Sequence, residues 1–356
     1  MSTNYNNKIK GSIFGGLIAD SIGFLFEGHS QSFIKKYLKR IENKEIINYV
    51  RGYSKKLNIN GPINNKNRLF CKWSYDFGQY TDDSQLSLLI IDNILKNSGK
   101  FSIEEYGYQI TELFVNEKIV GYGNTTKTFT KNIIGGIKYK YAGHISTSNG
   151  SLMRSDIFGI LFFNKSNETL IDCIYKQSMM THLSNLSFAT SLSSAYVIKY
   201  IMNNKEIRSD ILLSELYSLV KNINIKISKA ITEMNNIINL EWKDAFIEIK
   251  KYETIVWDKN KLSSCCLTTF LWALYSFLNN KNSFEDCLIM ALQVGGDVDT
   301  IGKIACSYSG CYLGINNLPK VFLEKLHDKK ERNYQIIDSQ INKLIEYIKN
   351  DKIHYL

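Results

Sequence analysis

The sequence has 356 residues, 44% hydrophobic and 22% charged, which is ordinary for a soluble globular protein with a sizeable core in one large domain or two small ones. Lys and Arg outnumber Asp and Glu by 44 to 34, and this surplus favours anionic partners. The lysines are dispersed, however, and no dense basic stripe with interleaved aromatic residues occurs, so we do not expect a nucleic-acid site. With only two prolines, the chain favours long helices over an all-β fold.

The cysteines and the termini indicate where the protein works. Their number is odd and they lack the paired spacing of metal ligands, which is typical of free, buried thiols in a reducing compartment. The N-terminal segment MSTNYNNKIK has no apolar core of a signal peptide, and no apolar run reaches about 18 residues. We therefore expect a cytoplasmic, monomeric protein with no membrane partner. The seven cysteines are Cys71, Cys173, Cys265, Cys266, Cys287, Cys306 and Cys311.

Helical periodicity begins at residues 8–27, where Gly11, Gly15, Gly16 and Gly23 fall on one side and indicate close packing against another helix. Residues 30–70 are polar and irregular, and we expect a loop there. Asp82 followed by Gln85 matches the start of a helix. An apolar run over 152–163 is expected to be buried. Further helices are predicted at 82–96, 103–117, 127–139, 168–180 and 186–202.

The second half continues the helical pattern. The stretch 241–262 has no readable periodicity, and the sequence GGDVDT (295–300) interrupts the helices before Gly314 ends the next one. No internal repeat, linker or strand–helix alternation occurs, so we predict one all-α domain spanning 1–356. Helices are predicted at 209–240 (with a break), 267–279, 284–294 and 301–313, followed by an amphipathic stretch over 321–348.

Two acidic clusters lie far apart in the sequence. The first alone is explained by a helix start with acidic residues in its first turn. The second has two glycines before an Asp-x-Asp pair, which indicates unusual torsions or a close backbone approach, and it precedes an apolar helix whose first amides add positive potential. Together they offer only oxygen ligands, with enough charge for two divalent cations, and so favour Mg²⁺ or Mn²⁺ over Zn²⁺. The ligand candidates are Thr81, Asp82, Asp83, Asp297, Asp299 and Thr300.

The order of these motifs resembles the ADP-ribosylglycohydrolase family, whose hallmark is Thr-Asp-Asp or Ser-Asp-Asp early and Gly-Gly-Asp-x-Asp-Thr late. Other blocks are similar to the family in the same order, and the agreement covers about residues 8 to 320, leaving the amphipathic helices of 321–350 outside it. The matching blocks are GSIFGGLIADSIGFLFE (11–27), GYGNTTKTF (121–129), SNGSLMR (148–154), MTHLSN (180–185) and GGDVDTIGKIACSYSGCYLGINNLP (295–319).

The resemblance implies an orthogonal, all-helical fold with a binuclear Mg²⁺ centre held by the six residues of the two clusters, Mn²⁺ being a possible substitute. Glu27 or Asp297 would be the catalytic base, Asp20 would support the metal site, and Arg154 is expected to make a structural contact. Residues implied along the ADP-ribose are Ser148, Asn149, Gly150, Ser151, Met153 and His182, with Gly121 and Gly123 of the glycine loop.

The implied reaction is hydrolysis of the N- or O-glycosidic bond at the distal ribose, through an oxocarbenium-like transition state. The implied partners are an ADP-ribosylated protein or a small ADP-ribosyl conjugate; arginine, serine and a nucleic-acid end all stay open as acceptors. The alternative is a non-catalytic ADP-ribose-binding protein. The presence of all six metal-ligand residues argues against this alternative. An isoprenoid-synthase reading is disfavoured because Leu86 occupies the place of a needed acid. The segment KLSSCC (261–266) replaces a glycine-rich loop of relatives, which leaves the choice of substrate open.

Overall fold

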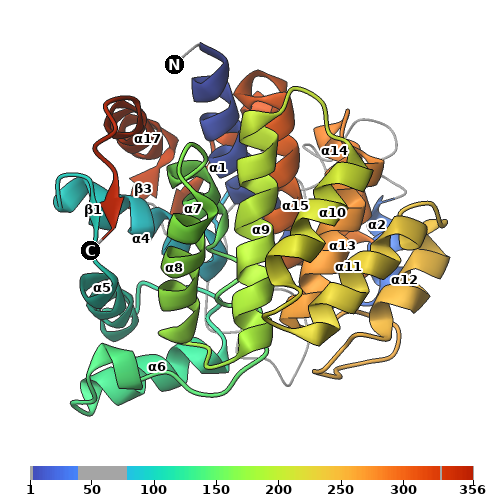
Figure 1. Cartoon of the computed structure of the whole chain (residues 1–356), viewed down its shortest axis with the longest axis horizontal. Helices are drawn as coiled ribbons and strands as arrows, with labels where there is room; N and C mark the ends of the chain where they lie inside the picture. Colours follow the sequence, from blue (N-terminus) through green and yellow to red (C-terminus); the bar gives the residue numbers. More distant parts are fainter. Residues whose placement is uncertain (1–2, 39–77, 329–330, 356) are drawn as a thin grey trace.

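Two helices at the centre of the fold, α1 (Thr3–Gly23) and α15 (Val298–Leu313), pack backbone against backbone along their length (Figure 1). A Cβ atom added to Gly11 would lie 2.1 Å from the carbonyl oxygen of Gly310, and one added to Gly23 would lie 2.5 Å from the Cα of Asp299. The glycine pattern therefore predicted the close packing correctly. The contact also brings the end of α1 to the start of α15, where the late acidic cluster lies.

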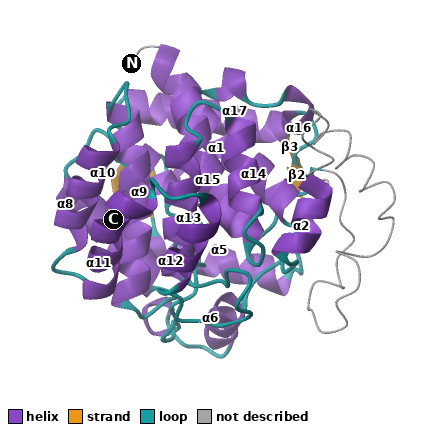
Figure 2. Cartoon of the chain, turned by 90° about the vertical axis from the view of Figure 1, so that its right-hand side faces the viewer, coloured by secondary structure: helices purple, strands orange, loops and turns teal. Residues whose placement is uncertain are grey.

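The computed structural model describes residues 3–38, 78–328 and 331–355, and nearly all of their regular structure is helical (Figure 2). The all-α fold class is thus confirmed. The other helices are α2 (Gln31–Leu38), α4 (Asp82–Lys96), α5 (Ile103–Val115), α6 (Asn124–Ile134), α7 (Asp156–Leu161), α8 (Asn167–Met179), α9 (Asn185–Asn203), α10 (Ser209–Val220), α11 (Ile225–Ile237), α12 (Trp242–Lys250), α13 (Cys266–Asn279), α14 (Phe284–Leu292), α16 (Lys320–Leu323) and α17 (Tyr334–Lys349), with 3₁₀ turns η2 (Tyr139–Tyr141) and η3 (Ile315–Asn317).

Short strands and a buried helix complete the packing. Strand β1 (Lys100–Phe101) pairs in parallel with β4 (His354–Tyr355), and β2 (His327–Asp328) pairs antiparallel with β3 (Arg332–Asn333). Helix α9 is buried over most of its length and contacts α7, α8, α13 and α15. Its many Ser and Ala residues allow this close approach, because small side chains bring helix axes together. The core thus runs from α7 through α9 to α15.

Five sequence expectations need correction. The helix predicted at 127–139 is α6, which begins at Asn124 and ends at Ile134. Residues 31–38 form α2 rather than a loop, while the rest of the predicted loop, 39–70, lies outside the described residues. The unreadable stretch 241–262 begins with α12. The helix predicted at 301–313 already begins at Val298, so Asp299 and Thr300 lie in its first turn and Asp297 is its N-cap residue. The C-terminal stretch is divided by the β2–β3 pair, because its backbone pairs with itself between α16 and α17.

The described cysteines are all buried free thiols, as expected; Cys71 lies outside the described residues. Among the residues that the structure describes, no helix combines the length and the apolar character needed to cross a membrane.

The substitution Gly310→Ala tests the central helix contact. Its methyl group would lie 2.0 Å from the carbonyl oxygen of Gly11, and overpacking of this kind costs about 1–3 kcal/mol. We expect a loss of that size in the free energy of unfolding, measured in urea. The control is Gly302→Ala in the same helix, whose Cβ would meet no atom closer than 3.5 Å and which gains helix propensity. Equal midpoints for the two variants would contradict the close packing.

Candidate functional site

One cavity of about 420 Å³ collects residues from segments far apart in the sequence. It lies where the end of α1, the first turn of α4, the glycine loop before α6, the segment before α7 and the start of α15 meet. Of the residues predicted from the sequence, Thr81 and Ser151 do not line it. Those that do are Glu27, Asp82, Asp83, Gly121, Gly123, Ser148, Asn149, Gly150, Met153, His182, Asp297, Asp299 and Thr300.

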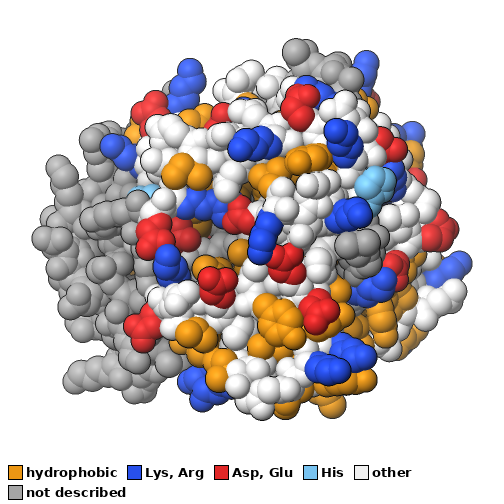
Figure 3. All heavy atoms as spheres, turned by 90° about the vertical axis from the view of Figure 1, so that its left-hand side faces the viewer, with side chains coloured by type: hydrophobic (Ala, Val, Ile, Leu, Met, Phe, Trp, Pro, Cys, Tyr) orange, Lys and Arg blue, Asp and Glu red, His pale blue; other side chains and the backbone are white. Residues whose placement is uncertain are grey.

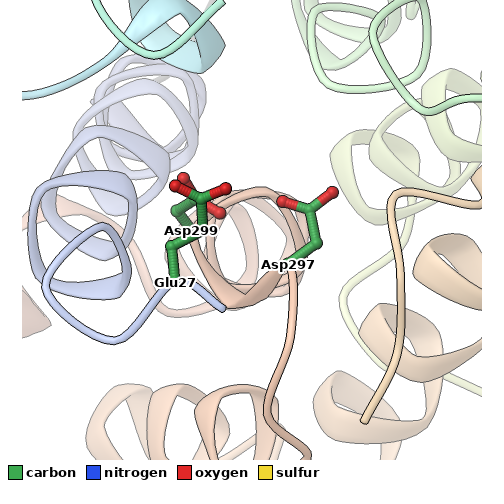
Figure 4. Close-up of side chains that lie close together, drawn as sticks. All are labelled: Glu27, Asp297 and Asp299. Atoms are coloured by element: carbon green, nitrogen blue, oxygen red, sulfur yellow. The ribbon is translucent and has the colours of Figure 1, made fainter. Parts of the chain in front are cut away.

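Three carboxylates converge at one end of this cavity. One oxygen from each of Glu27, Asp297 and Asp299 lies within 4.8 Å of the other two. Figure 4 shows Glu27, from the turn after α1, beside Asp299, with Asp297 across from them at the start of α15. Oδ1 of Asp299 is buried and receives no hydrogen bond from any described residue. Buried carboxylate oxygens without a donor are costly unless a cation or proton compensates them, so this donor set fits a hard divalent cation.

A second group of contacts joins the two acidic clusters. The Thr300 hydroxyl lies 3.1 Å from Oδ2 of Asp83 and 3.3 Å from Oδ1 of Asp297. The amide of Asn149 donates to Oδ2 of Asp297 at 2.8 Å and to the Thr269 hydroxyl at 3.1 Å. Asn149 was predicted to lie along the ligand; it lines the cavity and also fixes the orientation of a carboxylate.

Asp20 holds the early cluster from behind. Its carboxylate accepts hydrogen bonds from the backbone amides of Thr81 and Ser84 and, at 2.7 Å, from the Thr81 hydroxyl. Because the Thr81 hydroxyl donates its hydrogen to Asp20, the lone pairs of its oxygen are not used in this bond and could bind a cation. Helix α4 therefore starts with its first amides pinned to Asp20, which sets the direction of Asp82 and Asp83 toward the cavity.

The carboxyl groups carry raised pKa values. Burial raises the pKa of Asp82 and Asp83 well above the usual range, and the neighbouring Asp20 carboxylate raises both further. Burial likewise raises the pKa of Asp299, with the adjacent charges of Glu27 and Asp297 as the next causes. Removing water from like charges disfavours their ionised forms. Asp82, Asp83 and Asp299 therefore hold their protons more tightly than exposed carboxyls do, until an opposite charge replaces them.

The other end of the cavity is built from hydroxyl groups and an imidazole. The hydroxyls of Thr125, Ser146 and Ser148 lie within 3.1 Å of one another, at the N-terminal end of α6. Nε2 of His182 lies 3.0 Å from the Ser148 hydroxyl. Burial lowers the pKa of His182 well below its usual value, with the positive charge of Arg154 as the second cause, so the ring is neutral. Several hydroxyl donors beside a helix N-terminus suit an anionic group.

The remaining predicted residues have structural contacts. Arg154 is buried and donates to the side chain and carbonyl of Gln177 and to the Thr181 hydroxyl, which in turn contacts Nδ1 of His182. This is the structural role expected for the arginine. Ser151 is fully buried and its hydroxyl contacts Ser191 instead of the cavity.

Two glycines of the predicted site lie where the cavity leaves little space for a side chain. A Cβ atom on Gly150 would lie 3.0 Å from the His182 ring. One on Gly121, which has a φ of +84°, would lie 3.1 Å from Oδ1 of Asp82. Any larger residue would therefore push against the imidazole or the carboxylate.

Sequence reasoning missed one wall of the cavity. It comes from the loop between α12 and α13, whose backbone pairs with the glycines of the late cluster: the amide of Asp297 donates to the carbonyl of Leu262 at 3.1 Å. A Cβ on Gly296 would lie 1.7 Å from that carbonyl oxygen, so only glycine fits there. The segment 261–266, which replaces the glycine-rich loop of relatives, thus still reaches the site through Ser264. The residues not predicted are Tyr122, Asn124, Thr125, Thr126, Ile255, Trp257 and Ser264.

Comparisons with known proteins find related chains that match most of this one. The ADP-ribosylhydrolase ARH3 of Xenopus tropicalis is 22% identical over 346 residues, covering 88% of this chain and 89% of that protein. The ADP-ribosylarginine hydrolase Tri1 of Serratia proteamaculans is 21% identical over 257 residues, covering 70% and 63%. A solved chain of an ADP-ribosylglycohydrolase-related protein complex has the same fold, with a TM-score of 0.66 at 16% identity over 96% of this chain and 99% of that one. A sequence model described as ADP-ribosylglycohydrolase matches residues 1–352. The chain therefore belongs to the ADP-ribosylglycohydrolase family.

Proposed function

We propose that the protein is a Mg²⁺-dependent hydrolase that releases ADP-ribose from a modified protein or a small ADP-ribosyl conjugate. The observation that carries this proposal is the meeting of the Asp82–Asp83 pair with Glu27, Asp297 and Asp299 at one end of a single cavity. Support comes from the family match and from two relatives named as an ADP-ribosylhydrolase and an ADP-ribosylarginine hydrolase.

The carboxylate end would hold the cations. Two Mg²⁺ ions there would polarise the hydroxyls of the distal ribose and the attacking water. Four carboxylates match four positive charges, and the donor set contains no His or Cys, which argues against zinc. The residues that we assign to the cations are Thr81, Asp82, Asp83, Asp297, Asp299 and Thr300.

Other residues of the cavity would transfer the proton and bind the diphosphate. Glu27 or Asp297 would accept the proton of the attacking water, because both carboxylates belong to the acidic group at which the distal ribose would bind. The hydroxyls of Thr125 and Ser148 would bind the diphosphate, with His182 holding Ser148 in place. The bond cleaved is the N- or O-glycosidic bond at C1 of the distal ribose, and the products are ADP-ribose and the unmodified acceptor.

A direct assay tests the proposal. The protein is incubated in Mg²⁺ with arginine- and serine-ADP-ribosylated peptides, and released ADP-ribose is measured, with an EDTA-treated sample beside it. Release that requires Mg²⁺ supports the proposal. Tight binding of ADP-ribose without release from any conjugate would show instead a non-catalytic ADP-ribose-binding protein. Calorimetry with ADP-ribose and AMP completes the test, since equal affinities would show that the distal ribose does not contribute to binding.

The raised pKa values of Asp82, Asp83 and Asp299 predict how cations stabilise the fold. In the folded protein without metal these carboxyls hold protons at a pH where unfolded ones have lost theirs, so the metal-free protein loses stability as pH rises through the folded-state pKa values. A cation replaces those protons. We therefore expect the Mg²⁺-induced rise in melting temperature to grow as pH rises through these folded-state pKa values, and the stabilisation free energy to reach about 2.7 kcal/mol at 100 times Kd. Melting curves in Mg²⁺ and in EDTA that coincide at every pH would contradict the cation site.

A further inference from the structure

The segment from α6 to residue 146 leaves the cavity and returns to it. It starts with Asn124 and Thr125, which line the cavity, and it ends at Ser146, whose hydroxyl contacts that of Thr125 at 3.0 Å. Between these points the chain forms α6, η2 and a short loop, which protrude at the lower edge of the molecule (Figure 1). The outer surface of residues 127–145, here called the α6 rim, therefore borders the cavity at both of its ends.

The α6 rim is basic and has no compensating charge of its own. From residue 118 to residue 155 the sequence contains no Asp or Glu. Lys131, Lys138 and Lys140 are exposed, Lys127 is half-buried, and none of the four forms an ion pair with a described residue. The α6 rim thus carries four positive charges and no negative one, although lysines also occur throughout the rest of the sequence. Local positive potential of this kind attracts an acidic partner.

The same surface exposes large apolar side chains. The exposed fractions are 57% for Ile134, 43% for Ile137, 68% for Tyr141 and 81% for Ile145. Figure 3 shows hydrophobic and basic side chains together along the lower edge of this face. Single exposed apolar residues are ordinary, but several in one short segment that also has uncompensated lysines are typical of a contact surface with an apolar centre and a charged rim.

We propose that the α6 rim docks an acidic, apolar segment of the protein that carries the ADP-ribose, next to the modified residue. This proposal rests on the proposed function, since the cavity must receive the ADP-ribosyl group. Isoleucine side chains offer no flat face for stacking bases, whereas aromatic platforms are the usual partners of single-stranded nucleic acid. Three exposed isoleucines against a single exposed aromatic ring, that of Tyr141, therefore favour a protein partner. Its carboxylates would face the lysines, and its aliphatic groups would cover the isoleucines.

Charge reversal with a matched control tests the docking surface. The triple variant Lys131→Glu/Lys138→Glu/Lys140→Glu is compared with Lys221→Glu/Lys226→Glu/Lys229→Glu, which makes the same charge change on exposed residues around α11. The probes are fluorescein-labelled ADP-ribosylated peptides with either Asp-Leu or Lys-Ser flanks, and a single ADP-ribosylated amino acid. Binding is read by fluorescence anisotropy, and hydrolysis by ADP-ribose release.

We expect the rim variant to bind the Asp-Leu peptide about tenfold more weakly at low salt, with a raised KM and an unchanged kcat, while the control variant matches wild type. Hydrolysis of the single amino-acid conjugate should stay unchanged in both. Ile145→Ser should weaken the binding of the Asp-Leu peptide at high salt as well, because the contribution of Ile145 to binding is apolar and is not screened by salt.

Several outcomes would overturn the docking proposal. Equal affinity of wild type for the Asp-Leu and Lys-Ser peptides would remove the charge preference. A single-stranded oligonucleotide that binds more tightly than the Asp-Leu peptide, and only with the lysines intact, would assign the surface to nucleic acid. Absence of hydrolysis of every conjugate would defeat the proposed function alone, because the anisotropy measurement still reports on docking.

Discussion

Replacing Asp299 by asparagine is expected to lower the rate of ADP-ribose release by about 10²-fold, the size common for defects in metal ligands and in substrate geometry. The substitution keeps the size of the side chain and removes one charge. The cluster would then offer three carboxylates to four positive charges, and the amide would put an NH₂ group or a weaker oxygen where the buried Oδ1 now has no donor. Metal content should fall with activity.

The control for this variant is Asp286→Asn, the same chemical change on an exposed residue of α14, outside the cavity. It should keep both the metal content and the rate of wild type. Metal content is measured after gel filtration, beside a melting curve that shows whether each variant is folded. If Asp299→Asn retained the full rate and full metal content, Asp299 would have no part in holding cations.

The sequence was sufficient to predict most of the helices and most of the residues that line the cavity, because glycine and acidic patterns have few structural explanations. Gly11 and Gly23 indicated a close helix contact, and α15 is the partner they required. That contact places Glu27 beside Asp299, so two blocks far apart in the chain form one site. The start of α15 was placed too late, since positive φ at Gly295 and Gly296 lets the helix begin directly after Asp297.

The contacts between site residues could not be predicted, because they depend on distances that no spacing in the chain determines. Asn149 supports Asp297, and the Thr81 hydroxyl donates to Asp20; both bonds cross from one element to another. The wall that carries Ile255 and Trp257 has no periodicity. It is held by backbone hydrogen bonds between Leu262 and both Gly295 and Asp297, and by the buried Glu253 carboxylate, which accepts from the amide of Ser263 at 2.7 Å.

The variant Glu27→Gln should separate proton transfer from cation binding. Glutamine keeps the length of the side chain but accepts a proton from water far less readily than a carboxylate does. If Glu27 acts as base or positions the water, kcat should fall by about 10²-fold or more, while metal content and the affinity for ADP-ribose stay at the wild-type level. Stopped assays of release, metal analysis and calorimetry with ADP-ribose measure the three quantities on one preparation.

Glu27 lies where a carboxylate could act either as a base or as a metal ligand, and the Glu27→Gln variant distinguishes these two roles. Its carboxylate lies within 4.8 Å of those of Asp297 and Asp299, close enough to share a cation as well as to activate a water. Loss of one equivalent of metal in Glu27→Gln would make it a ligand, and full activity would move the proton acceptor to Asp297. Glu285→Gln, an exposed change outside the cavity, controls for the substitution itself. We expect an unchanged metal content with a lowered kcat, because the two acidic clusters already supply four charges to the cations without Glu27.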